Sequence, residues 1–270
     1  MSRKSRLGAA AAGIAAAVAL SACSTGVAGQ PVADPTTASS ATVAIPSAAP
    51  ESTWLTIPAE QAAAAPRRVQ LLQTAADGAT KRCTAGPAVV AEAGAARRGY
   101  LAAGHCDGRP GSSVSADGEA VEPYTSTRLG DRGVTVTWGT ANAAPTVAGG
   151  FRIAGVLKQH AVQQLPQGTT VCMDSNVSGV RCGPVVENDG TGIYLDLPSE
   201  RGDSGAPLFL VSDRGTATLI GLAEQRSAGY TFGAYLDPLL DEVGAKALVD
   251  PAVAVNPASD PRYSSATTAQ

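Results

Sequence analysis

One serine of the chain, Ser204, stands in a local sequence suited to nucleophilic chemistry. It lies in the turn Gly-Asp-Ser-Gly at residues 202–205, which precedes an apolar run at residues 208–211. A sharp turn with glycines on both sides leaves the hydroxyl exposed. The same turn lets the N–H groups of Gly202 and Ser204 point toward one spot beside that hydroxyl. Acyl transfer needs this combination of a nucleophile and two donors for the developing oxyanion.

A serine hydroxyl is a weak nucleophile and needs a general base. The chain has two histidines, and His105 follows an apolar run at residues 100–103 that predicts a strand. His160 has no second chemical group near it in sequence and is expected to be a surface residue. His105 is therefore the candidate base, and it precedes the candidate nucleophile Ser204 along the chain.

Short strands separated by turns must position these side chains, because glycine is abundant and β-branched residues occur in short runs. Val134, Val136 and Trp138 alternate with threonines, which is the pattern of a half-buried strand. The other predicted strands cover residues 83–90, 100–103, 192–197, 218–222 and 230–236. The sequence therefore predicts an all-β fold in which the candidate residues lie at strand ends and turns.

Two short motifs carry a resemblance to a known family. Ala-Gly-His-Cys at residues 103–106, followed by Gly-Asp-Ser-Gly at residues 202–205, resembles the chymotrypsin-type serine proteases. The chain is most similar to their small secreted bacterial branch, the streptogrisins, over residues 81–250. The resemblance implies two six-stranded antiparallel β-barrels with a short C-terminal helix. It also implies an endopeptidase that cleaves protein or peptide substrates and uses no metal or cofactor.

The resemblance assigns roles to residues of both motifs. His105 would be the general base and Ser204 the nucleophile, and the N–H groups of Gly202 and Ser204 would form the oxyanion hole. Asp203 would not be the acid of the triad. It would carry a buried charge that orders the turn, and Arg152 is a candidate cationic partner for it.

The acid of the triad is expected just before the predicted strand at residues 134–138. Asp131 fits this place and would accept the Nδ1–H of His105, which fixes the tautomer of the ring. Asp107 is too close to His105 in sequence for the same role. The chain departs from the family pattern at Arg132, because an apolar residue usually follows the aspartate.

The resemblance also pairs four of the five cysteines. Cys106, next to the candidate base, would pair with Cys83, and Cys172 would pair with Cys182 across a hairpin. An exported chain permits such disulfides. The alternative for Cys172 and Cys182 is half of a zinc site, but the sequence has no second Cys or His pair to complete it.

The residues expected around the substrate depart from the family pattern. Pro198 stands where relatives that cut after Lys or Arg have an aspartate, and Ser199 follows it. Glu224 lies in the segment expected to pair with the substrate backbone, where Ser and Gly are usual. With no acid at the pocket floor, small or apolar residues are expected before the cleaved bond. The competing expectation is that Glu224 turns inward and binds Arg or Lys.

The N-terminal residues resemble the signal sequence of a bacterial lipoprotein. Residues 1–22 combine a positively charged start with a short apolar stretch, and Leu-Ser-Ala-Cys at residues 20–23 resembles a lipobox. Cys23 would then carry lipid and tether the protein to the outer face of the cell membrane. Residues 23–58 are rich in Ala, Thr, Ser and Pro and are expected to form a flexible linker.

The remaining segments and the overall charge complete the prediction. Residues 59–80 could form a short helix before the protease-like domain, and residues 251–270 are expected to be a disordered tail. The net charge of −3 argues against a basic face for nucleic acid, and a monomer is expected.

Two other functions stay open. A non-enzymatic, lipid-anchored binding or structural protein of the same fold would explain the altered pocket wall. An esterase of another fold would need a Gly-x-Ser-x-Gly turn, whose spacing residues 202–205 lack.

Overall fold

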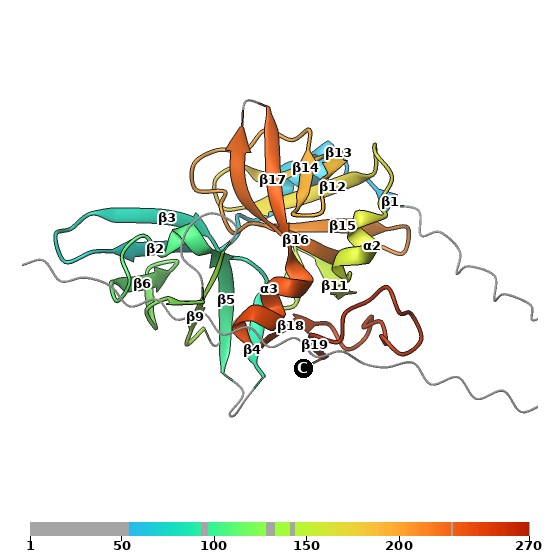
Figure 1. Cartoon of the computed structure of the whole chain (residues 1–270). Helices are drawn as coiled ribbons and strands as arrows, with labels where there is room; N and C mark the ends of the chain where they lie inside the picture. The colour runs from blue at the N-terminus through green and yellow to red at the C-terminus, as the bar shows by residue number, and fades with distance from the viewer. Residues whose placement is uncertain (1–53, 93–96, 128–132, 141–143, 228, 270) are drawn as a thin grey trace, which may run out of the picture. The chain divides into compact units, whose positions relative to one another are not determined.

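Short strands joined by turns make up most of the computed structural model, as the β-branched runs of the sequence predict (Figure 1). The structure describes residues 54–92, 97–127, 133–140, 144–227 and 229–269, with residues 225–227 as backbone only. The predictions for the signal sequence, Cys23 and Asp131 fall outside these ranges. Within them, no helix has the length and apolar character needed to cross a membrane.

Six strands of the C-terminal half close into an antiparallel barrel (Figure 1). Their order is β15-β12-β13-β14-β17-β16, and β16 pairs back with β15. Apolar side chains that point into the barrel, among them Met173, Leu208 and Ile220, form one core. The strands are β12 (Thr170–Ser175), β13 (Gly179–Asn188), β14 (Ile193–Leu195), β15 (Pro207–Ser212), β16 (Thr216–Ser227) and β17 (Tyr230–Tyr235).

Three further strands extend the sheet of this barrel. They are β1 (Trp54–Leu55), which pairs with β15, β11 (Phe151–Val156), which pairs in parallel with β16, and β10 (Thr146–Val147), which pairs with β11.

The N-terminal barrel is built from two sheets that share one core. The orders are β3-β2-β6-β7 and β19-β18-β4-β5-β9-β8. Leu71, Val90, Ala102 and Val114 belong to the buried cluster between them. The strands are β2 (Gln70–Thr74), β3 (Thr80–Thr84), β4 (Ala88–Ala91), β5 (Arg98–Ala103), β6 (Ser113–Ala116), β7 (Glu119–Val121), β8 (Thr125–Ser126), β9 (Val134–Trp138), β18 (Ala245–Val249) and β19 (Thr267–Ala269). The predicted all-β, two-barrel fold is confirmed.

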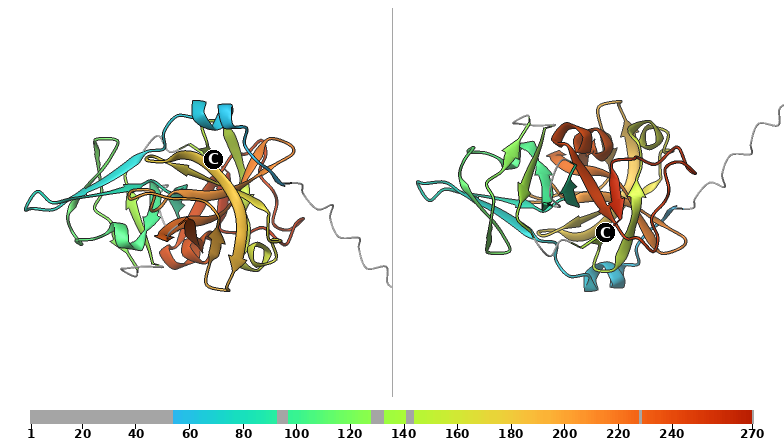
Figure 2. Two further views of the ribbon diagram at one scale, coloured as in Figure 1. Left: turned by 90° about the horizontal axis from the view of Figure 1, so that it is seen from above. Right: turned by 90° about the horizontal axis from the view of Figure 1, so that it is seen from below.

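The helices are short and lie outside the barrels. The predicted C-terminal helix is α3 (Leu236–Val243), which Gly244 ends in the left-handed conformation with φ 60°. The helix α1 (Ala59–Ala64) lies against β13 at the edge of the C-terminal barrel (Figure 2). The others are α2 (Gln159–Gln163) and the 3-10 turn η1 (Gly104–Cys106).

Strand pairing begins before residue 81, where the sequence places the start of the protease-like domain. Trp54 and Leu55 pair with β15, and Ile57 is buried. The helix expected over residues 59–80 covers only residues 59–64 and ends before Pro66, which cannot continue it. Residues 70–74 form β2 instead, because their alternating buried side chains suit a strand paired on both sides.

The C-terminal segment after residue 250 is packed, so the expectation of a disordered tail is wrong. Tyr263 is buried against Gly155, where an added Cβ would lie 2.6 Å from the tyrosine ring. Its hydroxyl lies 3.2 Å from the Thr218 hydroxyl, and the Ser264 N–H donates to Val156 at 2.8 Å. Contacts with the C-terminal barrel therefore order a segment whose own composition could not form a core.

Candidate active site

The Ser204 turn connects β14 with β15 and is held by backbone contacts from both barrels. Gly202 and Gly205 have φ values of 102° and 90°, which other residues rarely adopt. The Thr84 N–H of β3 donates to the Ser204 carbonyl at 2.9 Å, and the Gly205 N–H donates to the Ala223 carbonyl of β16 at 2.7 Å. The turn is therefore fixed between the N-terminal barrel and its own barrel.

Two backbone donors of this turn are available to a ligand. Among the described residues, the N–H groups of Gly202 and Ser204 donate to no protein acceptor. The Gly202 carbonyl accepts from the Thr84 hydroxyl at 2.8 Å, which orients the next peptide group. These two N–H groups are the donors to which the sequence analysis assigns the oxyanion.

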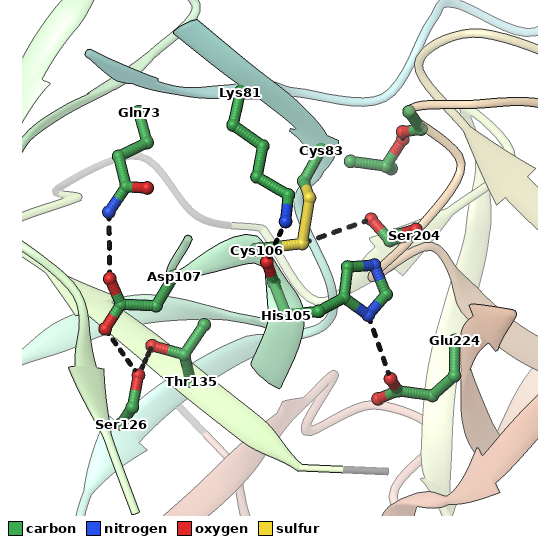
Figure 3. The surroundings of a disulfide bond; sticks show 12 residues. Gln73, Lys81, Cys83, His105, Cys106, Asp107, Ser126, Thr135, Ser204 and Glu224 are labelled. Atoms are coloured by element: carbon green, nitrogen blue, oxygen red, sulfur yellow. Dashed lines mark hydrogen bonds and ion pairs between the residues drawn. A yellow bond between two sulfur atoms is a disulfide. The ribbon is translucent and has the colours of Figure 1, made fainter. Parts of the chain in front are cut away.

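His105 lies in η1, directly after β5, and is anchored on both sides. Cys106 is bonded to Cys83, and the Lys81 ammonium donates to the His105 carbonyl. His105 and Ser204 line the same cavity, of about 450 Å³. Figure 3 shows the imidazole between Ser204 and Glu224, with one ring nitrogen toward each. The fold thus brings the predicted base and nucleophile together from different barrels.

Glu224 lies against His105, a contact that the sequence did not predict. Its Oε2 lies 3.6 Å from Nδ1 of His105, and its side chain is 0% exposed. It also lines a smaller cavity with Ser199, as the sequence predicts for the pocket wall. The signal that could have revealed its contact with His105 was a carboxylate that continues the buried run at residues 218–223.

Asp107 serves a separate polar cluster. It is 5% exposed and accepts hydrogen bonds from Gln73 Nε2 at 2.9 Å and from the Ser126 hydroxyl at 2.8 Å. Figure 3 shows its carboxylate directed away from the imidazole. Asp131 lies outside the described residues, although β9 begins at Val134 as predicted.

The buried Asp203 is held by neutral donors instead of the expected cation. Its Oδ1 accepts from the Ser178 N–H at 3.1 Å and from the Ser175 hydroxyl. Its Oδ2 accepts from the Ser178 hydroxyl and the Glu200 N–H, both at 2.6 Å. Arg152, the candidate partner, is exposed on β11. The turn is therefore ordered by serine hydroxyls and backbone N–H groups.

The smaller cavity beside Ser204 measures about 90 Å³. The residues that line it are Ser199, Glu200, Arg201, Asp203, Ser204, Ala223 and Glu224. The predicted pocket residue Pro198 is exposed and does not line it, and its carbonyl accepts from Arg181 at 3.3 Å. The Glu200 carboxylate pairs with Arg181 at the surface, so the buried acids of this cavity are Glu224 and Asp203.

The larger cavity has a strongly basic lining. Lys81, Arg82 and Arg201 contribute to its wall together with His105, and no carboxylate of the described residues does. All three cations are exposed, and none forms an ion pair within the described ranges. This side of Ser204 is therefore suited to negatively charged groups.

Both predicted disulfides, Cys83–Cys106 and Cys172–Cys182, are present. The second joins residues that face each other directly in the β12–β13 hairpin.

Cys83, His105 and Cys106 are the one group in the described part of the chain with metal-ligand spacing. The two sulfurs are joined in a disulfide, and metal binding requires thiolates, so these residues do not fit a metal site.

Comparison with known proteins establishes the fold. No family model and no curated protein matches the chain. Protease A of Thermobifida fusca superposes with a TM-score of 0.51 and 20% identity, over 67% of this chain and 96% of that one. The chymotrypsin of Cellulomonas bogoriensis superposes with a TM-score of 0.50 and 19% identity, over 67% of this chain and 96% of that one. A glutamic acid-specific serine protease superposes with a TM-score of 0.50 and 18% identity, over 66% of this chain and 96% of that one. The chain therefore has the chymotrypsin-like fold of bacterial serine proteases.

Proposed function

We propose that this chain is a chymotrypsin-type serine endopeptidase of the small bacterial branch, with Ser204 as nucleophile and His105 as base. The observation that carries the proposal is their meeting at one cavity, beside two N–H groups that donate to no protein acceptor in the described residues. The shared fold supports it, because the solved structures that the chain resembles are bacterial serine proteases.

The proposed reaction uses only groups of the chain, the substrate and water. Ser204 Oγ forms a bond to the carbonyl carbon while its proton moves to Nε2 of His105. The carbonyl π electrons move to the oxygen, which the N–H groups of Gly202 and Ser204 stabilise. Collapse breaks the C–N bond, and His105 gives its proton to the departing amine. Water then attacks the acyl-enzyme by the same two steps and restores Ser204.

A fluorophosphonate probe tests this proposal without knowledge of the substrate. The phosphorus of the probe takes the place of the carbonyl carbon. The Ser204 oxygen bonds to the phosphorus, and fluoride leaves. We expect one label per chain, which peptide mapping locates at Ser204. A folded protein that takes no label, or takes it at another serine, would favour the non-enzymatic alternative.

The smaller cavity, which Ser199 lines, would receive the substrate residue before the cleaved bond. The larger, basic cavity would then receive the residues after that bond, which suggests a preference for acidic residues there. With a peptide library, we expect Arg82→Gln to lower kcat/KM about 1.4- to fivefold for acidic sequences only, as exposed ion pairs contribute about 0.2–1 kcal/mol. Added salt should reduce the preference. Arg109→Gln removes the same charge from an exposed pair with Asp77 and serves as the control.

Before the cleaved bond, small or apolar residues remain our proposal, supported by the size of the smaller cavity. A library in which Arg or Lys is preferred at this position would contradict it.

We also propose that Cys23 carries lipid and holds a monomeric protein at the outer face of the cell membrane. The lipobox-like residues 20–23 after a short apolar stretch support this. Cys23→Ala should release the protein or stall its processing. The measurement is partitioning into detergent, and a variant that matures normally and still partitions with detergent would contradict the anchor.

A further inference from the structure

We infer that Glu224 positions the base His105, a role that rests on the proposed function. The contact joins the two barrels: Glu224 belongs to β16, and His105 lies in η1 of the N-terminal barrel. Glu224 Oε2 is 3.6 Å from Nδ1, and the glutamate side chain is 0% exposed against 21% for the histidine. Figure 3 shows this contact on the side of the ring opposite Ser204.

The backbone of β16 explains why the glutamate points to the histidine. Register between β16 and β17 shifts between Ala223 and Gln225, so Glu224 sits in a β-bulge. Bulges near active sites re-aim a side chain out of the regular alternation. Ala223 is tied to the serine turn twice, because it accepts from the Gly205 N–H at 2.7 Å and donates to the Ala206 carbonyl at 2.9 Å. The carboxylate is therefore fixed relative to both Ser204 and His105.

The chemistry of a carboxylate at Nδ1 is that of a positioning group. A buried carboxylate costs several kcal/mol unless donors or a positive charge compensate it. With the proton on Nδ1, the contact with Glu224 is favourable, and Nε2 is left unprotonated to receive the Ser204 proton. The imidazolium formed in the reaction would then be stabilised by the same carboxylate.

This assignment differs from the one that the sequence resemblance implies. The resemblance assigns the role to Asp131, on the segment before β9. The carboxylate that the described residues bring to Nδ1 is Glu224, whereas Asp107 is directed to Gln73 and Ser126. In the inferred arrangement the acid and the nucleophile come from the C-terminal barrel, and the base alone comes from the other.

The labelling kinetics of three variants show whether Glu224 or Asp131 positions His105. Glu224→Gln keeps the shape and removes the charge, so the rate of fluorophosphonate labelling should fall about 10²- to 10⁴-fold, as when a triad acid is neutralised. Glu224→Asp should recover part of the rate, and Asp131→Asn should lower it less than Glu224→Gln. A labelling rate unchanged in Glu224→Gln, or reduced more in Asp131→Asn, would overturn the inference.

A substrate-binding role for Glu224 predicts a different outcome. If the glutamate received Lys or Arg, Glu224→Gln would raise KM for those substrates alone. The inferred role predicts a loss of kcat for every substrate, with an unchanged preference in a peptide library.

A spectroscopic measurement tests the contact without any catalysis. The chain has two histidines, and His160 is exposed on α2, so it is an internal reference for His105 in ¹⁵N imidazole spectra. We expect wild-type His105 to be the Nδ1–H tautomer when neutral, and Glu224→Gln to change its signals but not those of His160. An Nε2–H tautomer in the wild type would overturn the inference even if no variant folds. A protein that takes no label yet shows the Nδ1–H tautomer would contradict the proposed function only.

Discussion

Ser204→Ala is expected to abolish labelling by a fluorophosphonate and to lower hydrolysis about 10⁶-fold in kcat, as when other serine proteases lose their nucleophile. The variant removes only the Oγ atom. The backbone contacts of the turn, from the Thr84 N–H to the Ser204 carbonyl and from the Gly205 N–H to Ala223, do not use that atom. The fold should therefore remain, which circular dichroism and a thermal melt can verify.

Matched variants show whether the loss is specific. His105→Ala should reduce labelling nearly as much, because the hydroxyl then has no base. His160→Ala changes the exposed histidine of α2, and Ser113→Ala changes an exposed serine of β6, so both should label at the wild-type rate. Residual labelling of the folded Ser204→Ala protein at another serine would show that the nucleophile has been misassigned.

Asp203→Asn is expected to destabilise the protein by about 2–4 kcal/mol and to abolish labelling, although only one oxygen becomes an NH₂ group. Each carboxylate oxygen accepts one backbone N–H that cannot rotate, from Ser178 at 3.1 Å and from Glu200 at 2.6 Å. In either orientation the new NH₂ group therefore faces a fixed donor. Chemical denaturation gives the loss of stability, and fluorophosphonate labelling gives the state of the oxyanion turn.

Asp189→Asn is the control for this substitution. Its Oδ1 accepts from the N–H groups of Thr191 and Gly192, while Oδ2 faces the Tyr194 hydroxyl, which can accept from an NH₂ group. Much less stability should therefore be lost than in Asp203→Asn. Equal losses in the two variants would show that charge, and not the fixed donors, decides the stability of the turn.

The core of the site could be predicted from sequence because its determinants are local. A glycine-flanked serine specifies a sharp turn, since Gly202 and Gly205 adopt positive φ values. A histidine after an apolar run specifies a strand end. The resemblance to a known family supplied the rest, including the two barrels and the pairings Cys83–Cys106 and Cys172–Cys182.

Contacts between distant segments could not be predicted in this way. Periodicity says that Glu224 follows a buried strand, but the bulge and the meeting of two barrels decide that it faces His105. The resemblance suggested a cation for Asp203, whereas the fold brings hydroxyls and N–H groups from β12 and the following turn. Composition suggested a disordered tail, yet Tyr263 packs over Gly155.

The sequence by itself thus determined the all-β class, several of the strands, the serine turn and the two residues proposed for the chemistry of this protein. Tertiary structure alone decided that Glu224 meets the imidazole, what holds the buried Asp203 and how residues 251–269 pack. The physical reason is the range of the interactions. Backbone preferences and side-chain alternation act over a few residues, whereas burial and hydrogen bonding depend on partners that only the folded chain brings close.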